Sequence, residues 1–382
     1  MRILLLSASY LPVLGGLQTA VHALAREWHG CGHQVEVFTQ RYPRRLPARE
    51  TLDGIPVRRE LFLTPSWRQL RRGRPDLFLA GLYASMFTQF RLESRLRAFQ
   101  PDVLNLHFPD SQIPFVLKLQ KKYSFKLVIS LHGHELLRYF DDNGQVLAGN
   151  GISVLRTALQ AADGITACSE YLLKKAGQAF PQAGQKGCVV YNGVELSRFN
   201  VKGKAFSSRP YLFAYGRLAY KKGFDLLLHA FGRFAAQNPD YDLILAGEGD
   251  QRASLETLAR ALGLGNRVRF WGRAASDEVV SLLAGSSLVV IPSRVEPFGI
   301  VALEGLAAGK PILATSVGGL PEILAETGNR LAAPTVEGLA EGLAWFSEPQ
   351  DWSALTRENR QAAARYSWSA AADRFCDLFS QL

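Results

Sequence analysis

Short apolar runs rich in β-branched residues alternate with longer amphipathic runs along this chain. In the first half the strand-like runs are Ile3–Leu6, Val35–Thr39, Val103–His107, Leu127–His132, Gly164–Ala167 and Cys188–Tyr191. In the second half they are Tyr211–Tyr215, Leu243–Ala246, Val268–Trp271, Leu288–Ile291 and Ile312–Ala314. Helix-like runs include Gln18–Gly30, Phe224–Gln237, Ser254–Leu262 and Ser276–Leu283. This alternation predicts an α/β protein with parallel sheets.

The length and one polar stretch predict two domains. A chain of 382 residues is long for a single hydrophobic core. Asn192-Gly193 and the polar stretch 202–210 read as a linker, and each side of it carries its own strands. We therefore expect one domain over residues 1–195 and a second over 205–365, followed by a final helix over 366–382. Ligands of open parallel sheets collect at the carboxyl ends of the strands, so two such domains facing each other would form a deep cleft.

The most informative segment is 293–304, which follows the apolar run ending at Pro292. Glu296 falls in a loop beyond a strand, and Glu304 falls on the helix expected to begin near Gly299. The free backbone N–H groups at a helix start favour phosphate, and carboxylates accept hydrogen bonds from sugar hydroxyls. A loop that offers both groups suits a nucleotide-sugar.

A second loop, Gly216 to Gly223, follows the strand Tyr211–Tyr215 directly. It places Arg217 in the loop and Lys222 at the start of the next helix. Fixed cations stabilise a diphosphate as its bond to a sugar breaks, because the leaving group gains negative charge. The alternative is an ordinary basic loop without a ligand.

Three features of the first half of the chain lie at or just after the ends of predicted strands. Gly15-Gly16 follows the first strand but lacks the G-x-G-x-x-G fingerprint of dinucleotide sites. It would let the backbone approach a phosphate or sugar, or it forms a simple turn. His132, in His132-Gly133-His134, is expected to donate or accept a hydrogen bond in the cleft, with a structural histidine or a metal ligand as alternatives. His107 ends another strand and has weaker support.

Other loops contribute less. Asp240-Tyr241-Asp242 matches the D-x-D pattern of metal-bound nucleotide-sugars, but it precedes its strand and so falls at the wrong end of the sheet. Gly247-Glu248 follows that strand and could border a nucleotide. The glycine loop 316–319 either contacts the ligand or forms a plain turn.

Composition and charge narrow the class of protein. The four cysteines form no C-x-x-C pair, which favours reduced thiols over a disulfide framework or zinc site. Met1–Leu6 favours a first strand over a signal peptide, and no apolar run reaches the ~20 residues that span a bilayer.

The formal net charge is +10, with arginines clustered between positions 41 and 74. No nucleic-acid-binding motif accompanies this charge. An anionic membrane surface or a phosphorylated glycolipid fits the charge better than nucleic acid does, and the alternative is a solvated basic face. The amphipathic stretch Leu77–Phe90 near the arginines suggests peripheral contact with an anionic membrane, although apolar residues at helical spacing are usually core.

Taken together, these segments resemble glycosyltransferase family four, retaining enzymes with the GT-B fold. The resemblance implies two Rossmann-like domains that face each other across a deep cleft, and a C-terminal helix, 366–382, that returns to the first domain. The resemblance covers nearly the whole chain, and its most specific signal is the spacing of Glu296 and Glu304. The residues that carry it are Gly15-Gly16, His132, Asn192-Gly193-Val194, Gly216-Arg217, Lys222-Gly223, Gly247-Glu248-Gly249, Pro292-Ser293, Glu296-Pro-Phe-Gly299, Glu304 and Ser316-Val-Gly-Gly.

The resemblance implies a role for each of these positions. Arg217 and Lys222 would hold the donor diphosphate, and Glu296 a hydroxyl of the donor sugar. His132 would contact that sugar, so the implied catalytic set is His132, Arg217, Lys222 and Glu296. The implied donor-binding positions are Gly15, Gly16, Gly216, Gly247, Glu248, Arg273, Phe298, Gly299, Ile300, Val301 and Glu304, with Glu304 on the ribose and the amides of Ile300 and Val301 on the phosphates.

The implied reaction moves a hexose-type sugar from a nucleotide diphosphate to a glycan or glycolipid acceptor with retention of anomeric configuration. The family has no obvious protein nucleophile, so the protein would supply positioning and charge stabilisation. No cofactor, metal or nucleic acid is expected, and the setting would be cytoplasmic, on or off a membrane face. The alternatives are a relative that epimerises or hydrolyses its nucleotide-sugar, and a catalytically silent protein that only binds it.

Overall fold

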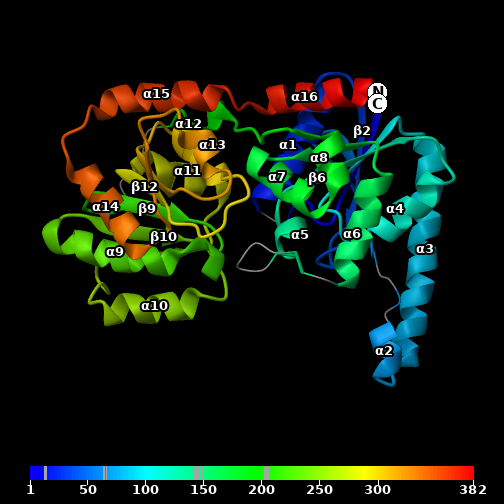
Figure 1. Cartoon of the computed structure of the whole chain (residues 1–382), viewed down its shortest axis with the longest axis horizontal. Helices are drawn as coiled ribbons and strands as arrows, with labels where there is room; N and C mark the ends of the chain where they lie inside the picture. The colour runs from blue at the N-terminus through cyan, green and yellow to red at the C-terminus, as the bar shows by residue number, and fades with distance from the viewer. Residues whose placement is uncertain (13–14, 63–64, 66, 141–145, 148, 202–205) are drawn as a thin grey trace. The chain divides into compact units, whose positions relative to one another are not determined.

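The structure is a computed structural model that describes residues 1–12, 15–62, 65, 67–140, 146–147, 149–201 and 206–382. The chain forms two compact units. Unit 1 contains Met1–Tyr191 together with Ala371–Leu382, and unit 2 contains Asn192–Ala370. Each unit is a parallel α/β sheet covered by helices (Figure 1), which confirms the predicted fold class.

The sheet of unit 1 has the strand order β3-β4-β2-β1-β5-β6-β7-β8. All neighbouring strands pair in parallel except β3 and β4, which pair antiparallel. Its strands are β1 Arg2–Ser7, β2 Gln34–Gln40, β3 Arg49–Leu52, β4 Ile55–Glu60, β5 Val103–His107, β6 Lys126–Leu131, β7 Gly164–Ala167 and β8 Gly187–Val189. The register pairs Ser7 with His107 and His107 with Ser130, so the exits of β1, β5 and β6 lie at one edge.

The helices of unit 1 are α1 Gly16–Gly30, α2 Trp67–Arg71, α3 Pro75–Phe99, α4 Ile113–Gln120, α5 His134–Leu137, α6 Asn150–Ala161, α7 Glu170–Ala179 and α8 Pro181–Lys186. The predicted amphipathic stretch Leu77–Phe90 falls within α3. The N-terminal part of α3 projects beyond the rest of the unit together with α2 (Figure 1). Among the described residues, no helix is both long enough and apolar enough to cross a membrane.

The last helix, α16 (Trp368–Gln381), belongs to unit 1 over most of its length, as the sequence predicts. Aromatic side chains attach this helix to the rest of unit 1. Trp28 is fully buried, and its indole ring lies 5.5 Å from the ring of Phe375 and 5.6 Å from that of Phe379. The Trp28 Nε1–H donates to the carbonyl of Ala372 at 3.2 Å, so this large side chain is buried without an unpaired polar group.

The sheet of unit 2 is parallel throughout, in the order β11-β10-β9-β12-β13-β14. Its strands are β9 Tyr211–Tyr215, β10 Asp242–Ala246, β11 Val268–Gly272, β12 Leu288–Ile291, β13 Ile312–Thr315 and β14 Arg330–Ala332. The central strands β9, β12 and β13 are almost wholly buried, as expected when helices cover both faces of a parallel sheet.

The helices of unit 2 are η1 Leu196–Phe199, η2 Tyr220–Lys222, α9 Phe224–Gln237, α10 Arg252–Ala261, α11 Ser276–Gly285, α12 Ile300–Ala307, α13 Leu320–Leu324, α14 Val336–Ser347 and α15 Trp352–Ala364. Phe231 and Phe234 of α9 share a buried cluster with Leu339 and Leu343 of α14. In Figure 1, α12, α13 and α15 lie on the opposite side of this sheet from α9 and α10. The sheet is thereby fixed from both faces, and its carboxyl edge is left to the loops.

Candidate active site

The loops at the carboxyl edge of the unit 2 sheet are joined to one another by backbone hydrogen bonds. Gly216 N–H donates to the carbonyl of Ala246 at 3.0 Å, and Leu218 N–H donates to that of Glu248 at 2.9 Å. Gly247 N–H donates to the carbonyl of Gly272 at 2.7 Å. The exits of β9, β10 and β11 therefore form one continuous rim, which contains the predicted positions Gly216, Gly247 and Glu248.

Two glycines in loops at the carboxyl edge of this sheet cannot be replaced without moving the backbone. Gly247 has φ +140°, and a Cβ there would lie 1.8 Å from the carbonyl oxygen of Gly216. Gly318 has φ +60°, and its Cβ would lie 1.8 Å from the carbonyl oxygen of Glu296. Both positions combine a left-handed backbone with direct backbone contact, which only glycine allows. The glycine loop 316–319 thus has a structural task in supporting the Glu296 loop.

Lys222 and Glu296 form a direct ion pair. The Lys222 Nζ lies 2.5 Å from Oε2 of Glu296, and Ser293 Oγ donates to the same oxygen at 3.3 Å. The Glu296 side chain is 9% exposed and that of Lys222 is 21% exposed. The sequence places both residues in the site but gives no sign that they bind each other. The pair fixes the direction of both side chains at the rim.

The rim carries more positive charge than this ion pair neutralises. Arg217 is exposed, and Lys221 lies close enough to Arg217 and Lys222 for their charges to act on it. Burial, followed by the charges of Lys222 and Arg217, lowers the pKa of Lys221. Three cations against one nearby carboxylate make a surface that attracts a phosphate anion. Lys221 is a member of this cluster that sequence reasoning missed, although it adjoins Lys222.

Arg294 holds the two charged loops together, and this role was also missed from the sequence. Its guanidinium donates to both carboxylate oxygens of Asp225 at 2.7 and 2.6 Å and to the carbonyl of Tyr220 at 2.9 Å. The same group stacks 4.1 Å from the centre of the Tyr220 ring. The carbonyl of Lys221 accepts from the backbone N–H of Arg294 at 2.8 Å. A bidentate guanidinium gives this connection a fixed geometry.

Glu304 lies one turn into α12 and accepts a hydrogen bond from the Tyr215 hydroxyl at the end of β9. Burial raises the pKa of Glu304, partly offset by the Tyr215 bond and the charge of Arg198. Burial, together with the Glu304 charge, raises the pKa of Tyr215 well above its usual value. The phenol therefore stays protonated and acts as a donor that orients the carboxylate. No role in the site is assigned to Tyr215 from the sequence.

The start of α12 has the geometry expected for anion binding. Gly299, with φ +111°, precedes the first helical residue Ile300, and Val301 follows in the first turn. The amides of a first helical turn lack partners within the helix. Phe298 is 3% exposed and its ring lies 6.5 Å from that of Tyr366, so its side chain belongs to the core. Any contact of Phe298 with a ligand would come from its backbone.

Glu248 and Arg273 lie at the β10 and β11 exits. Glu248 pairs with Arg252 one helical turn later. A Cβ on Gly272 would lie 3.3 Å from the Glu248 carboxylate, so the two exits are adjacent. Arg273 follows Gly272 and is exposed. The structure thus brings both residues to the same rim as Gly216 and Gly247.

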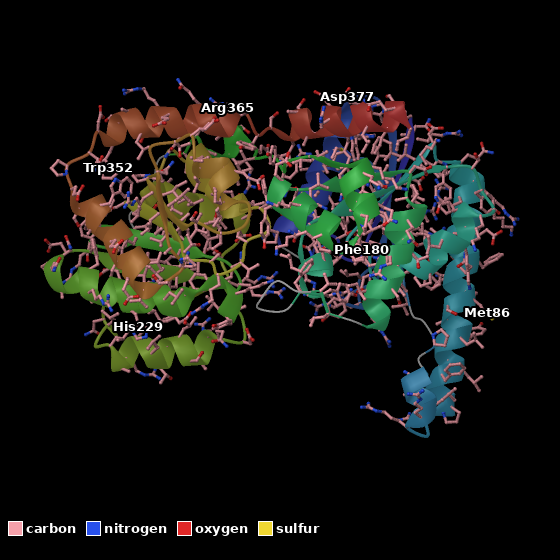
Figure 2. The ribbon with its side chains drawn as sticks, in the orientation of Figure 1. Met86, Phe180, His229, Trp352, Arg365 and Asp377 are labelled. Carbon is pink, nitrogen blue, oxygen red and sulfur yellow. The ribbon has the colours of Figure 1, made fainter. Side chains whose placement is uncertain are left out.

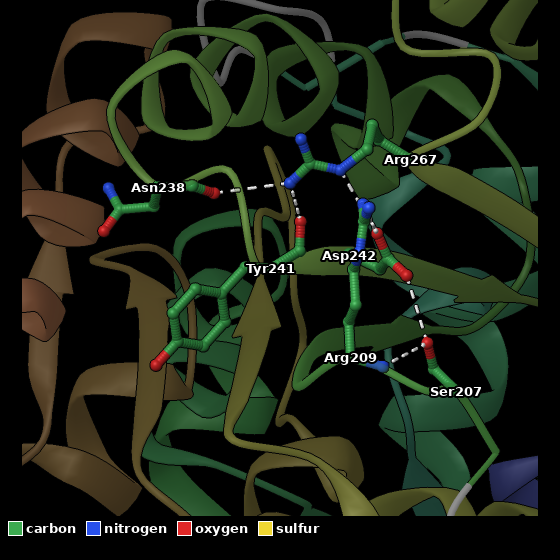
Figure 3. Close-up of polar contacts among 6 residues, drawn as sticks. All are labelled: Ser207, Arg209, Asn238, Tyr241, Asp242 and Arg267. Carbon is green, nitrogen blue, oxygen red and sulfur yellow. Dashed lines mark hydrogen bonds and ion pairs between the residues drawn. The ribbon is translucent and has the colours of Figure 1, made fainter.

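The D-x-D segment lies at the other end of the sheet, as its place before the strand predicts. Asp242 accepts from Arg267 Nε at 3.2 Å and from Ser207 Oγ at 3.0 Å (Figure 3). Arg209 adds an ion pair to Asp242 at 3.7 Å. A pocket of about 300 Å³ opens beside this network. The ion pairs give Asp242 a structural role at the amino edge. Among the described residues, no group of three or more histidine, cysteine or acidic side chains is placed to hold a metal ion.

In unit 1, His132 sits at the exit of β6 within a chain of hydrogen bonds. Its Nε2 lies 2.9 Å from Nδ1 of His107, whose Nε2 lies 2.7 Å from Oδ1 of Asn105. The Phe108 ring stacks on His132 at 5.3 Å and an interplanar angle of 7°. Burial lowers the pKa of His132 to about 3 and that of His107 well below its usual value. Both imidazoles are therefore neutral near pH 7.

The loop after His132 is fixed by Glu135. Its carboxylate accepts from the backbone N–H groups of His132 and of Gly133, the latter at 3.0 Å. The side chain is 1% exposed, and burial raises its pKa. Gly16 is the first residue of α1 and Gly15 precedes it, after the β1 exit. Gly15, Gly16 and His132 thus all follow strands that end at the same edge of the unit 1 sheet.

Comparison with known proteins matches both halves of the chain. The family model described as Glycosyltransferase Family 4 matches residues 14–198, and the one described as Glycosyl transferases group 1 matches residues 198–366. The chain belongs to the family-four glycosyltransferases. It is therefore a transferase enzyme, and the resemblance to this family noted in the sequence is confirmed.

Several curated relatives resemble this glycosyltransferase over nearly its whole length. It is 28% identical to an uncharacterized glycosyltransferase of Methanocaldococcus jannaschii, with 99% of this chain and 98% of the relative covered. It is 29% identical to a glycogen synthase of Mycobacterium tuberculosis, with 99% and 94% covered. It is 28% identical to a D-inositol 3-phosphate glycosyltransferase of Thermobispora bispora, with 96% and 90% covered.

Solved structures share the fold of this glycosyltransferase. Sucrose-phosphate synthase from Thermosynechococcus elongatus superposes with a TM-score of 0.79 at 20% identity, covering 100% of this chain and 99% of the other. The Anabaena protein HepE, solved in complex with UDP and glucose, has a TM-score of 0.76 at 21% identity, with 100% of both chains covered. These likenesses confirm the GT-B fold.

Proposed function

We propose that this glycosyltransferase moves a hexose-type sugar from a nucleotide diphosphate to a glycan or glycolipid acceptor and retains the anomeric configuration. Synthesis of a cell-envelope polysaccharide or a lipid-linked glycan, at a cytoplasmic membrane face, is the setting that we propose. The observation that carries the proposal is the grouping of Arg217, Lys222, Glu296 and Glu304 at one edge of the unit 2 sheet. Cations for a diphosphate and carboxylates for hydroxyls lie on adjoining loops there.

The leaving group explains the cations. As the sugar–phosphate bond breaks, negative charge grows on the diphosphate, and positive groups already held in place stabilise that charge without reorganising. Lys222 is held by Glu296, and Arg217 is close enough to the adjoining Lys221 for its charge to act on that residue. The amides of Ile300 and Val301 at the start of α12 add donors of fixed direction.

The two carboxylates explain selectivity for a nucleotide-sugar. Glu304 would accept hydrogen bonds from ribose hydroxyls, with Tyr215 fixing its orientation. Glu296 would accept from a hydroxyl of the donor sugar through the oxygen that does not bind Lys222. Gly247, Glu248 and Arg273 lie on the same rim and are proposed to border the nucleotide.

Unit 1 would supply neutral groups. His132, uncharged because of its burial, would hydrogen-bond to the donor sugar, and the Gly15-Gly16 backbone would approach it closely. Glu296 pairs with Lys222 and is assigned to a hydroxyl of the donor sugar, not to its anomeric carbon. We propose that the acceptor hydroxyl attacks on the face that the diphosphate leaves. We propose separately that no metal is essential.

The comparisons support a nucleotide-sugar donor. The Anabaena fold relative was solved with UDP and glucose and also with UDP-glucose. The glycogen synthase and inositol-phosphate glycosyltransferase relatives are named for sugar transfer to a glycan and to a phosphorylated polyol. These names leave the acceptor of this chain open, which is why the proposal names acceptor classes only.

The proposal is tested by screening nucleotide-sugars for thermal stabilisation and then for transfer. A bound donor raises the apparent melting temperature by mass action. The stabilising donor is incubated with glycan and glycolipid acceptors in the presence of a chelator, and the anomeric configuration of the product is read by NMR. We expect released nucleotide, a glycoside with the donor's configuration and no effect of the chelator.

Lys222→Met is the matched test of the site, with Lys174→Met on α7 as control for the loss of one exposed charge. We expect a 10²–10³-fold loss of turnover for Lys222→Met, the order seen when one charge-stabilising group is removed. Lys174→Met should keep full activity. Donor turnover without transfer to any acceptor, or a product with inverted configuration, would contradict the proposal.

A further inference from the structure

The projecting half of α3 carries an apolar stripe that unit 1 does not cover. Leu79, Tyr83, Met86 and Phe90 are 61%, 71%, 65% and 68% exposed. Their spacing of four, three and four residues places them in one line along the helix. Figure 2 marks Met86 on the projecting part of the helix. Large apolar side chains gathered in this way indicate an interaction surface.

The stripe lies opposite the side by which α3 is attached. The buried residues of α3 are Thr88, Leu92, Leu96 and Phe99, which lie on the other side of the helix. From Pro75 to Phe87, all of which the structure describes, no residue is buried. Several turns of helix are therefore held away from the core, with their largest apolar side chains facing outward.

The charge around the stripe is positive. Between positions 71 and 92 the sequence has four arginines and one aspartate. Arg74 pairs with that aspartate, Asp76, and Arg91 pairs with Glu60 while stacking 4.4 Å from the centre of the Phe87 ring. Arg71 and Arg72 are exposed and have no ion pair among the described residues.

We propose that this stripe, with Arg71 and Arg72, binds the surface of a bilayer that contains anionic lipids. A helix that lies in the membrane interface has an apolar face with flanking cations, and tyrosine is enriched at that depth. A second copy of the chain fits less well, because two stripes in contact would bring the same arginines together on a protein of net charge +10. The proposal extends the glycolipid acceptor class above but does not depend on turnover.

Flotation of the full chain with vesicles tests the proposal. Vesicles of phosphatidylcholine mixed with phosphatidylglycerol should carry the protein at low ionic strength, and phosphatidylcholine alone should carry much less. The triple variant Tyr83→Ser, Met86→Ser, Phe90→Ser should lose binding roughly tenfold or more, since each side chain buries apolar area. Arg71→Gln with Arg72→Gln should lose roughly fivefold per arginine and remove most of the salt dependence.

A control triple variant removes exposed apolar side chains away from α3, namely Leu147→Ser, Val154→Ser and Leu196→Ser. It should float like the natural chain. Because the α3 positions are exposed, the stripe variant should keep its circular dichroism, its donor stabilisation and its turnover of a water-soluble acceptor. No flotation of the natural chain, undiminished flotation of the stripe variant, or a dimer that only the stripe variant dissociates would overturn the proposal.

A separate observation concerns Asn105 in unit 1. Its Nδ2 donates to the backbone carbonyl of Val128 at 3.2 Å and to Ser130 Oγ at 2.8 Å. A backbone carbonyl can only accept, so the amide cannot be reversed and its Oδ1 must face His107. His107 Nε2 therefore carries the hydrogen, and its Nδ1 is left as an acceptor. His132 must then donate through Nε2 at 2.9 Å.

From this chain we infer that Asn105 and His107 are positioning residues that select the tautomer of His132, with hydrogen on Nε2 and a lone pair on Nδ1. The Phe108 ring stacked on the imidazole opposes the ring flip that would put Cε1 in the place of Nε2 beside His107. Under the proposed function, His132 would then accept a hydrogen bond from a sugar hydroxyl through Nδ1 rather than donate one.

Long-range ¹H–¹⁵N spectra of the labelled full chain read this tautomer directly and need no donor. The His132 signals are assigned by their loss in His132→Gln, and exposed histidines such as His229 serve as the internal reference. We expect protonated Nε2 and bare Nδ1 at neutral pH. His107→Leu should give a mixture of tautomers, whereas His107→Gln, which offers an amide oxygen, should restore the natural one. Protonated Nδ1 on His132 in the natural chain would overturn the inference, and so would an unchanged tautomer in His107→Leu.

Discussion

The ion pair between Lys222 and Glu296 makes a prediction that stability measurements can check without a substrate. The perturbation is a double-mutant cycle of Lys222→Met and Glu296→Gln, which removes each charge while keeping most of the side-chain volume. Because the two charged atoms are 2.5 Å apart and both side chains are largely buried, removing either partner leaves the other charge poorly solvated.

The magnitude follows from burial. Breaking a fully buried ion pair by removing one partner costs about 3–5 kcal/mol. Lys222 is one-fifth exposed, so water reduces this cost. We expect Lys222→Met to lower the free energy of unfolding by about 2–3 kcal/mol, because the more deeply buried Glu296 is left charged. Glu296→Gln should cost about 1–2 kcal/mol, since the amide oxygen can still accept from Ser293.

The double variant should be less destabilised than the two single variants added together, by at least about 1 kcal/mol. The assay is urea unfolding of the full chain, with the transition of unit 2 analysed separately because a two-unit chain need not unfold in one step. The control is the same cycle on Arg233 and Glu337 in the same unit. That pair is 3.2 Å apart but 58% and 68% exposed, and should show coupling below about 0.5 kcal/mol.

Additive effects of Lys222→Met and Glu296→Gln, or coupling no larger than that of the exposed control pair, would refute the claim that burial makes this contact strong. A further comparison separates structure from chemistry. Lys222→Met should still lose 10²–10³-fold in turnover under conditions where urea unfolding shows the variant to be fully folded, because the diphosphate needs the cation during the reaction.

Three further predictions concern the support of the two units. Gly318→Ala should lower the free energy of unfolding by about 2 kcal/mol or more, because its Cβ would clash with the backbone of Glu296. The control is Gly263→Ala, which has φ +71° but open space around it and should cost only about 1 kcal/mol of strain. Urea unfolding of the two variants measures the difference. Burial alone would raise the pKa of Asp225, but the hydrogen bonds and charge of Arg294 outweigh it and lower that pKa. The stabilisation is therefore present above the unfolded-state pKa near 4 and lost as pH falls through the lower folded value, so Asp225→Asn should flatten this acid-side decline in melting temperature. Trp28→Ala should cost about 3–5 kcal/mol and expose α16 to proteolysis, which limited digestion would detect.

The strands and helices of both sheets were the most predictable part of the fold. Leu288–Ile291 and Phe224–Gln237 occur with the predicted bounds, because their apolar periodicity agrees with their burial. The hairpin of β3 and β4 was missed. The edge strand β3 alternates exposed and half-buried residues, and β4 contains a proline and three charged residues, which weakens the apolar signal. The turn residues Asp53 and Gly54, with φ of 48° and 79°, are the two-residue signal that could have found it.

In the site, the sequence predicts which loops meet but not which side chains bind each other. Arg294 with Asp225 and Tyr215 with Glu304 are 69 and 89 residues apart, and no local pattern encodes their directions. Asn105 and His107 are different. They stand two apart on one strand and so share a face of the sheet, which makes their contact a prediction that strand geometry alone could have supplied.

The charges of the two units differ in kind, and this difference constrains how a reaction could be divided between them. The imidazoles at the unit 1 sheet edge, His107 and His132, are neutral at physiological pH because burial opposes their protonation. Neither can balance the charge of a departing diphosphate. The corresponding edge of unit 2 carries Arg217, Lys221 and Lys222 against the carboxylate of Glu296. Under the proposed function, stabilisation of the leaving group is therefore assigned to the unit 2 cluster, and the two histidines of unit 1 are assigned directed hydrogen bonds. A variant of His132 and a variant of Lys222 should accordingly fail in different ways, the first in selection of the sugar and the second in release of the nucleotide.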